Sequence, residues 1–443
     1  MLNDTHQASL LSWVASANEA DSEFPVQNLP YGAFRRKGSS VAHQIGVAIG
    51  EQILPVSRLL GLNDLSTTER EAAATCDSPT LNRLMALGPR HWSALRQALS
   101  RGLRQGSPHY ASLAPALVPI VEAEFAVPAQ IGDFTDMYTS LDHALNVGRL
   151  FRPDNPLMPN FKWLPCGYHA RVSSIGVSGQ RFVRPKGQVM PPGESAPIVT
   201  ATRRLDYELE LAIWVGTGNS LGESVGLDQA NQHVFGLGLL NDWSARDIQA
   251  WEYQPLGPLL SKNFATTVSP WVVTMEALEP FRSSWHRDSA DPQPVSYLES
   301  TLNRERGAID IGLEAWLHTD AMARAGRPPH RLSKTNFRHN YWTVAQMIAH
   351  HTVNGCNLCV GDLIGSGTQS GPGAGESGAL IELTQGGKRP ITLPGGEERT
   401  FLADGDTVIL RARAEREGFR SVGFGDCEGT VLPAARAQSL PIT

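Results

Sequence analysis

Long apolar runs are missing from this chain of 443 residues. A helix that spans a bilayer needs about 20 consecutive apolar residues, and no stretch approaches that length. A short apolar segment lies within Ala8–Ala17, but no Lys or Arg precedes it, which departs from the pattern of a secretory signal peptide. The sequence therefore predicts a cytoplasmic protein that has no contact with a membrane.

Cysteine is scarce as well, and the chain has no excess of positive charge. Five cysteines are scattered along the chain, and an odd number does not fit a disulfide framework, so we expect a reducing compartment. Cys356 and Cys359 form a C-x-x-C without the second pair of a typical zinc site, and we interpret them as structural. The net charge of −6 lacks the basic footprint of a nucleic-acid-binding protein.

The length exceeds the usual limit of a single hydrophobic core, so we expect two domains. A change of composition near residue 128 places them at 1–127 and 128–443. The first domain reads as partly helical, with helix-forming residues over 67–74 and 81–103. The 42 glycines and 30 prolines indicate many turns, and the second domain reads as sheet-dominated.

Short β-like segments recur through the second domain between glycines and prolines. The expected strands are 173–178, 205–216, 268–273, 378–383 and 407–411, and the expected helices are 241–253 and 342–352. The Gly/Ser-rich segment 365–378 has neither the P-loop lysine nor the G-x-G-x-x-G spacing of a phosphate site. We interpret it as a mobile loop between strands.

Three carboxylates alternate with apolar residues over 205–211. Asp206, Glu208 and Glu210 share one face of the expected strand, at a spacing of roughly 6–7 Å, and the apolar run 212–215 follows. Like charges held together near a core repel each other and resist desolvation. A hard cation such as Ca²⁺ or Mg²⁺ relieves both costs, whereas a solvated acidic face is the alternative.

The expected helix 241–253 carries four different polar side chains on one face. Asp242, Arg246, Gln249 and Tyr253 occur at i, i+4, i+7 and i+11. This stripe suits the recognition of an oxygen-rich anionic ligand beside a metal. A capped surface helix with an Asp242–Arg246 pair is the alternative.

Two further segments add candidate ligands and donors. Asp136 can join the acidic strand at a metal, and Tyr138 can donate to a ligand. Lys262, with Thr266 nearby, can stabilise developing negative charge. It can also form a Schiff base if it is buried, or be an ordinary loop lysine.

His143 is the first candidate for a general base, because imidazole titrates near neutral pH. The assignment requires that His143 lie near the metal and that a carboxylate orient its ring. His350 and His351 are rival candidates. Glu382, within an apolar run expected to be a strand, is the candidate that orients the ring.

Taken together, these segments resemble the fumarylacetoacetase family. The run Phe24–Gly32 is similar to its N-terminal signature, and the runs 241–249 and 251–253, with 255–258, are long and specific. Other segments similar to the body of the family are 133–152, 162–174, 204–210, 241–270, 350–368 and 420–433. The resemblance therefore covers nearly the whole chain.

The resemblance implies hydrolysis of the carbon–carbon bond of 4-fumarylacetoacetate to fumarate and acetoacetate, the last step of tyrosine and phenylalanine breakdown. It implies a mainly β (β-rich α+β) fold, with a small N-terminal β-barrel-like domain followed by a C-terminal β-roll catalytic domain, in a homodimer. The partner is then a small diketo acid, with no nucleic acid and no membrane. The implied cofactors are Ca²⁺ and Mg²⁺, and no organic cofactor is required.

The resemblance also implies roles for individual residues. The implied Ca²⁺ ligands are Asp136, Glu208, Glu210 and Asp242, and a Mg²⁺ site would involve Asp242, Lys262 and Thr266. His143 would be the general base, oriented by Glu382, and Arg246, Gln249 and Lys262 would stabilise developing charge. The implied substrate contacts are Tyr138, Arg152, Tyr168, Gln249, Tyr253 and Thr368, with Arg152 as our choice for the fumarate carboxylate.

Two departures from the family pattern are visible. Ala265 stands where the family usually has glycine before the threonine, and the spacing from Arg152 to Tyr168 is one residue short. The rival functions are an acylpyruvate hydrolase or a keto-acid decarboxylase or hydratase, a catalytically silent metal-binding protein, and a Schiff-base lyase that uses Lys262. The match in the N-terminal region argues against the first rival.

Overall fold

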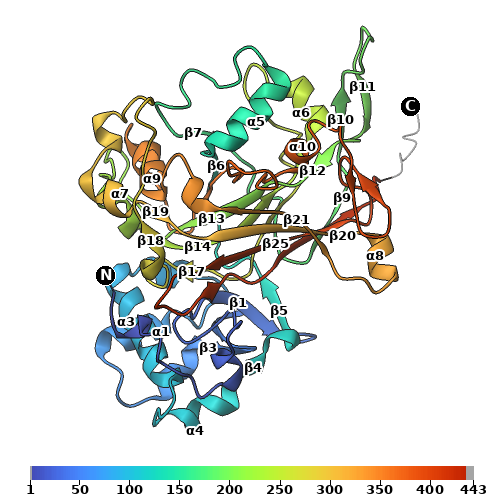
Figure 1. Ribbon diagram of the computed structural model, residues 1–443. Helices are drawn as coiled ribbons and strands as arrows, with labels where there is room; N and C mark the ends of the chain where they lie inside the picture. Colours follow the sequence, from blue (N-terminus) through green and yellow to red (C-terminus); the bar gives the residue numbers. More distant parts are fainter. Residues whose placement is uncertain (1, 436–443) are drawn as a thin grey trace, which may run out of the picture.

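The computed structural model describes residues 2–435. In Figure 1 the N-terminal part (blue to cyan) lies below the long strands of the remainder, and α5, α6 and α10 lie on the other side of those strands. The fold is rich in strands that form curled sheets, so the predicted β-rich class is confirmed. Among the described residues, no helix is both long enough and apolar enough to cross a bilayer.

The N-terminal part combines a five-stranded sheet with helices. The sheet has the order β4-β3-β2-β1-β5, with β1 (Tyr31–Arg36), β2 (Gln44–Ile49), β3 (Gln52–Pro55), β4 (Val118–Pro119) and β5 (Ala123–Ala126). The helices are α1 (Thr67–Ala74), α2 (Asn82–Met85), α3 (Pro89–Leu103) and α4 (Tyr110–Leu113). Helix α1 begins where the Ser66 side chain accepts from the Glu69 amide and Glu69 accepts from the Ser66 amide, a capping box.

The larger part contains an eight-stranded sheet whose central strands lead to the candidate site. Its order is β7-β6-β22-β13-β14-β16-β8, and β17 also pairs with β14. The strands are β6 (Phe134–Tyr138), β7 (Cys166–His169), β8 (Ile175–Val177), β13 (Leu209–Val215), β14 (Val234–Asp242), β16 (Thr266–Val268), β17 (Val273–Thr274) and β22 (Leu363–Gly365).

A six-stranded sheet packs against it, in the order β21-β20-β25-β27-β9, with β26 paired to β25. Its strands are β9 (Gln180–Val183), β20 (Gly312–His318), β21 (His330–Asn336), β25 (Thr407–Ala414), β26 (Val422–Gly423) and β27 (Cys427–Leu432). Four two-stranded pairs complete the sheets: β10 (Lys186–Val189) with β11 (Ile198–Ala201), β12 (Leu205–Asp206) with β15 (Ser244–Ala245), β18 (Arg282–Ser283) with β19 (Ala308–Ile309), and β23 (Ile391–Thr392) with β24 (Glu398–Arg399).

The remaining elements are helices around these sheets. The α-helices are α5 (Leu141–Phe151), α6 (Arg246–Glu252), α7 (Thr301–Arg306), α8 (Asp320–Arg324), α9 (Val344–Thr352) and α10 (Leu380–Leu383). Short 3₁₀ helices cover Asp4–His6, Ala15–Asn18, Val56–Gly61, Ala114–Ala116, Ile120–Glu122, Ala230–His233, Glu279–Phe281, Ser296–Leu298 and Phe337–His339.

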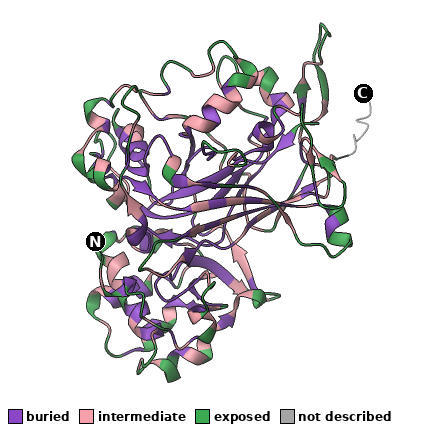
Figure 2. Cartoon of the chain, in the orientation of Figure 1, coloured by how far each residue is buried: buried purple, intermediate pink, exposed green. Residues whose placement is uncertain are grey.

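Strand β13 is buried on both faces. The alternation of its side chains between these faces explains how an acidic site arises inside a sheet. Leu209, Leu211 and Ile213 point into the core shared with the six-stranded sheet. On the other face, Trp214 packs into the core shared with the N-terminal part. Because successive side chains alternate, Glu210 lies on the Trp214 face but nearer the start of the strand. Figure 2 shows the buried ribbon running through these central strands.

The two parts of the chain are joined by a common core and by hydrogen bonds. Phe235 packs between Tyr31 and Trp92, with ring centroids 5.6 and 5.2 Å away. The Tyr31 amide donates to Val272 O at 3.0 Å, and the Val272 amide donates back at 2.8 Å. The Asn28 side chain donates to Gly423 O at 2.7 Å. The N-terminal sheet is therefore anchored on the strand layer that carries the candidate site.

Several local expectations are corrected by the structure. The run 205–211 is interrupted, since β12 ends at Asp206 and β13 begins at Leu209. The run 378–383 contains the short helix α10 rather than a strand, because the Asp206 carboxylate accepts hydrogen bonds from the first amides of this turn. The run 268–273 lies largely between β16 and β17.

The expected helix 241–253 begins later than predicted. Asn241 and Asp242 continue β14, because they pair with Thr267 and Thr266 of β16, and α6 begins at Arg246. The segment 365–378 starts at the last residue of β22 and continues as a loop, but Ser366 and residues 368–370 are buried. The first half of this loop is therefore part of the interior.

Candidate active site

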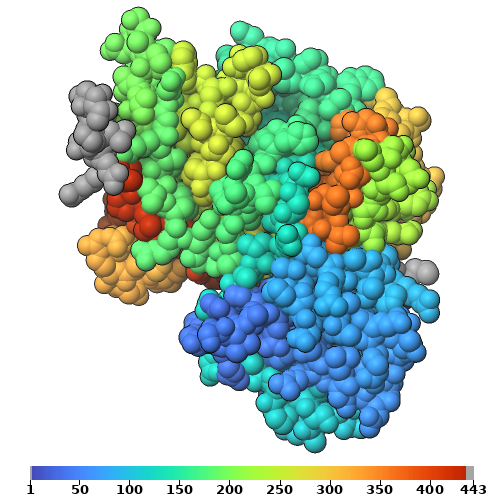
Figure 3. Space-filling view, turned by 180° about the vertical axis from the view of Figure 1, so that it is seen from behind, coloured from blue at the N-terminus to red at the C-terminus, as the bar shows by residue number. Residues whose placement is uncertain are grey.

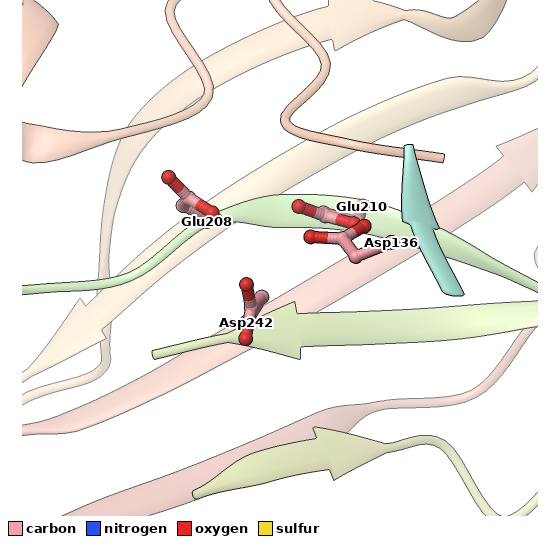
Figure 4. A group of neighbouring side chains, drawn as sticks. All are labelled: Asp136, Glu208, Glu210 and Asp242. Atoms are coloured by element: carbon pink, nitrogen blue, oxygen red, sulfur yellow. The ribbon is translucent and has the colours of Figure 1, made fainter. Parts of the chain in front are cut away.

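Four carboxylates converge at the ends of the central strands (Figure 4). Each of Asp136, Glu208, Glu210 and Asp242 offers an oxygen that lies within 4.8 Å of the others. Asp136 is on β6, Glu210 is on β13 and Asp242 ends β14, while Glu208 precedes β13. All four side chains are buried. The structure thus brings together the four residues that the family resemblance implied as Ca²⁺ ligands.

The cluster has the chemistry of a cation site. Asp136 Oδ1 and Glu210 Oε1 are buried without a hydrogen-bond partner. Burial, followed by the neighbouring carboxylates, raises the pKa of Asp136 and of Glu210 well above the usual range. Unpartnered carboxylate oxygens in a dry site are costly unless a cation pairs with them, and oxygen ligands suit hard divalent ions. The residues present therefore fit such an ion.

Two cations of the chain lie beside one edge of this cluster. Lys262 Nζ donates to Asp242 Oδ2 at 2.7 Å and pairs also with Glu208. Arg246 Nη1 lies 2.8 Å from Glu208 Oε1. Burial tends to raise the pKa of Glu208, but the charges of Lys262 and Arg246 outweigh it and lower that pKa to about 2. Glu208 is thus held ionised, and the carboxyl oxygens without a partner lie on the Asp136–Glu210 side.

Asp206, the third carboxylate of the acidic stretch, lies outside the cluster. Its Oδ2 accepts from Arg246 Nε at 2.9 Å. The same carboxylate accepts from the Leu380 amide at 2.8 Å and the Ile381 amide at 3.1 Å. The break in the expected strand turns Asp206 away from Glu208 and Glu210. Asp206 instead connects Arg246 to helix α10, which carries Glu382.

His143 and Glu382 form a buried pair at the other side of the site. His143 lies in the first turn of α5, where its amide donates to the Ser140 hydroxyl, and its Nδ1 lies 2.7 Å from Glu382 Oε1. Asn146 donates to Glu382 Oε2 at 2.9 Å, and Ser370 Oγ donates to the same carboxylate. Burial tends to raise the pKa of Glu382, but the interaction with His143 and the hydrogen bonds from Asn146 and Ser370 lower it overall. The carboxylate is therefore ionised and fixed.

A cavity of about 470 Å³ opens between the carboxylate cluster and His143. The candidates that line it are Asp136, Tyr138, His143, Arg152, Tyr168, Glu208, Glu210, Arg246, Gln249, Tyr253, Lys262 and Thr368. The other three candidates do not line the cavity but contact residues of the site. Asp242 forms an ion pair with Lys262, Thr266 Oγ1 lies 3.4 Å from Asp242 Oδ1, and Glu382 forms a hydrogen bond with His143. All the site residues that the family resemblance implied are thus in one place.

The candidate substrate contacts surround this cavity from several separate segments of the chain. Tyr168 OH, on β7, donates to Asp242 Oδ2 at 2.8 Å, and β7 pairs Tyr168 with Asp136. Arg246 Nη1 donates to Gln249 Oε1 at 3.1 Å. Arg152 follows α5, and its Nε is buried without a partner. The cavity therefore offers phenol, amide and guanidinium groups around the acidic cluster.

The rival histidines lie elsewhere. His351 Nε2 lies 3.0 Å from the Thr135 hydroxyl, and His350 Nδ1 lies 2.8 Å from Tyr297 OH. Neither lines the cavity. Ala265, at the departure from the family pattern, is buried and has no positive φ. Its backbone therefore accommodates a side chain before β16.

Some residues of the site were not found from the sequence. Asn146 follows His143 at i+3 on α5, a spacing that places two side chains on one helix face and that could have revealed it. Ser370 lies in a loop, and no local pattern connects it to Glu382. Met137 and Phe151 supply apolar lining, and they read as ordinary core residues in the sequence.

Comparison with known proteins agrees with this geometry. A family model for the C-terminal part of fumarylacetoacetate (FAA) hydrolase matches residues 134–432, and a model for the N-terminal part of fumarylacetoacetase matches residues 27–128. Fumarylacetoacetase of Caenorhabditis elegans is 47% identical over 422 residues, covering 94% of this chain and 97% of that protein. The chain belongs to the fumarylacetoacetase family. The predicted family membership is confirmed.

Other members of the fumarylacetoacetase family are similarly close. The protein of Homo sapiens is 45% identical over 419 residues, covering 94% of this chain and 97% of its own length, and that of Oryza sativa subsp. japonica is 44% identical over 420 residues, covering 93% and 95%. A solved fumarylacetoacetate hydrolase from the psychrophilic Exiguobacterium antarcticum has a TM-score of 0.51 at 16% identity, covering 91% of this chain and 99% of that chain. At that identity, the likeness shows a shared fold.

Proposed function

We propose that this member of the family hydrolyses 4-fumarylacetoacetate to fumarate and acetoacetate, with the cavity as its active site. The similarity to fumarylacetoacetases over nearly the whole chain supports this reaction. The observation that carries the assignment of residues is the position of the His143–Glu382 pair, which faces the same cavity as the four carboxylates. A base, a cation site and anion-binding groups thus share one cavity.

Asp136, Glu208, Glu210 and Asp242 would hold a Ca²⁺ ion. The support is their oxygen chemistry, their mutual distances and the two oxygens without a partner. When bound, a divalent ion supplies Lewis acidity to a 1,3-dicarbonyl substrate. Asp242 and Thr266 would contribute to a neighbouring Mg²⁺ site. A protonated lysine has no lone pair, so Lys262 would take part in that site through its ion pair with Asp242 or through its backbone.

His143 would act as the general base towards water. Because Glu382 accepts the Nδ1 proton of the ring, the lone pair of Nε2 is free to accept a proton. The activated water would attack the carbonyl next to the scissile bond, and cleavage of that bond leaves negative charge on the acetoacetate fragment. Arg246, Gln249 and Lys262 line the cavity and would stabilise that charge.

The substrate would be held by residues around the rest of the cavity. Arg152 is placed to pair with the terminal carboxylate of the fumaroyl group, and its unpartnered Nε supports this role. The other contacts would come from hydroxyl and amide groups that line the same cavity: Tyr138, Tyr168, Gln249, Tyr253 and Thr368.

Replacing His143 tests this assignment. We expect His143→Ala to lower kcat by about 10²–10⁴-fold, the usual contribution of a general base, while the metal content of the purified protein stays that of the wild type. His350→Ala is the matched control, since His350 lies outside the cavity. The measurement is the loss of diketone absorbance with fumarylacetoacetate. Equal loss of activity in both variants, or full activity in His143→Ala, would remove His143 from the mechanism.

We also propose that residues 1–127 and 128–443 act as two domains of a cytoplasmic homodimer. The five free cysteines, all within the described residues, support a reducing compartment.

A groove of about 1080 Å³ on β20, β21 and β25 is lined by residues of both charge signs, among them Glu314, Lys334 and Arg413. Such a surface can be self-complementary about a two-fold axis. Light scattering should give about twice the chain mass of 48.0 kDa, and a monomer mass would refute the dimer.

A further inference from the structure

Glu252 is an unexpected residue at the end of helix α6. A negative side chain at a helix C-terminus opposes the helix dipole. Its carboxylate nevertheless accepts three backbone hydrogen bonds from the chain that follows: from Leu259 at 2.8 Å, Leu260 at 3.1 Å and Ser261 at 2.8 Å. Hydrogen bonds from these residues outweigh the effect of burial and lower the pKa of Glu252. The carboxylate therefore closes residues 253–260 into a loop.

This loop forms one wall of the active-site cavity. Tyr253, Gln254, Gly257 and Pro258 all line the cavity. Inside the loop, the Gly257 amide donates to Tyr253 O at 2.8 Å. The position of the wall thus depends on how the two ends of the loop are held together.

The loop has little apolar burial to hold it in place. Leu256 is 96% exposed and Leu259 is 63% exposed. In Figure 3 the α6 region (yellow-green) lies on the molecular surface beside the projecting β10–β11 hairpin (green). A segment without a buried anchor is fixed chiefly by its polar contacts, and here three of them end on one carboxylate.

We propose that Glu252 is a positioning residue that holds the wall formed by residues 253–258 against the bound substrate. The inference rests on the proposed function, because it assigns substrate to this cavity. Glu252 does not line the cavity itself, so it acts through the loop that it closes.

The proposal predicts which kinetic constant depends on Glu252. Lys262 follows the loop, but its ammonium group has its own anchors in Glu208 and Asp242. Loss of the Glu252 contacts would therefore free the wall without moving the charged groups beside the scissile bond. Substrate affinity would fall, and the chemical step would be largely preserved.

Replacing Glu252 tests this prediction. Glu252→Gln presents an NH₂ group to at least one amide and cannot accept from it. Glu252→Asp keeps the charge but shortens the reach. We expect Glu252→Gln to raise KM for fumarylacetoacetate by about tenfold with kcat within about threefold of wild type. The KM of Glu252→Asp should lie between those of the wild type and Glu252→Gln. Glu51→Gln, at an exposed glutamate in the turn between β2 and β3, should match the wild type. An unchanged KM, or a fall in kcat alone, would overturn the proposal.

A second readout does not need catalysis. Chymotrypsin cleaves after large apolar residues, and we expect cleavage after Leu256, Leu259 or Leu260 to be at least about fivefold faster in Glu252→Gln than in Glu51→Gln. Equal cleavage rates would overturn the proposed clamp. If the wild type does not hydrolyse fumarylacetoacetate, the proposed function fails, and this cleavage comparison still decides whether Glu252 holds the loop.

Discussion

At the scale of single residues, the carboxylate cluster determines how the protein responds to metal and to pH. The pKa values of Asp136 and Glu210 are raised, chiefly by burial. A carboxyl group whose pKa is higher in the folded than in the unfolded state favours folding while it is protonated, and this contribution is lost as pH rises through the folded pKa. Without a divalent ion, the cluster therefore costs stability as pH increases above the ordinary carboxyl range.

A divalent ion should remove this cost. We expect Ca²⁺ to raise the Tm of EDTA-treated protein, and to raise it more at about pH 8 than at about pH 6, because protons compete with the ion for the same oxygens. Near 100 Kd of free ion, the gain is about 2.7 kcal/mol. Thermal unfolding with and without Ca²⁺ measures it. Glu210→Gln should reduce the shift and Glu194→Gln, at an exposed glutamate, should not. A shift that is independent of pH would contradict the prediction.

At the scale of elements, the sequence predicted the composition of the site better than its geometry. The acidic alternation identified Glu208 and Glu210, but a strand pattern cannot reveal that the chain breaks at Asp206, because tertiary hydrogen bonds to α10 cause that break. Asp242 was placed with Arg246 on one helix. It instead ends β14, since pairing with β16 is a non-local interaction. The turn between β14 and α6 still directs both residues to the same site.

Strand β22 offers a direct test of how tightly the elements enclose the cluster. It lies between β6 and β13, and a Cβ atom at Gly365 would lie 2.3 Å from Asp136 Oδ1 and 3.1 Å from Glu210 Oε2. We expect Gly365→Ala to displace these carboxylates and lower Ca²⁺ affinity by about 10–100-fold, as changes next to metal ligands do. Calorimetric titration measures this.

The matched control is another glycine in a strand. A Cβ atom at Gly312 would meet only Arg413 O, at 3.4 Å, which is an ordinary contact. Gly312→Ala should therefore leave Ca²⁺ affinity unchanged. Wild-type affinity in Gly365→Ala would show that the carboxylates adjust freely, and it would weaken the assignment of a preformed cation site.

At the scale of the whole molecule, the N-terminal part and the larger part of the chain share a core. Trp214 and Phe235 belong to the same buried cluster as Tyr31 and Leu99. The sequence indicated a boundary near residue 128 from its change of composition, but contacts across that boundary involve residues far apart in the chain. Composition and periodicity describe single segments, so they cannot reveal this shared core.

The shared core predicts that the protein unfolds as one unit. We expect a single calorimetric transition, and we expect Phe235→Ala to lower its midpoint by an amount that corresponds to about 3–5 kcal/mol. The kcat per folded molecule should stay that of the wild type, because Phe235 does not line the cavity. Phe419→Ala, outside the shared core, is the control. Two separate transitions, with only one shifted by Phe235→Ala, would refute a common core.

Arg96 illustrates what this arrangement means in a living cell. Its guanidinium group is buried and holds the backbone at Asn28, whose side chain in turn donates to Gly423 O near the far end of the chain. We expect a substitution of Arg96 to lower the amount of folded protein in the cell, because quality-control proteases remove destabilised copies. The resulting deficiency would be one of abundance, and a small molecule that binds the native state could reverse it.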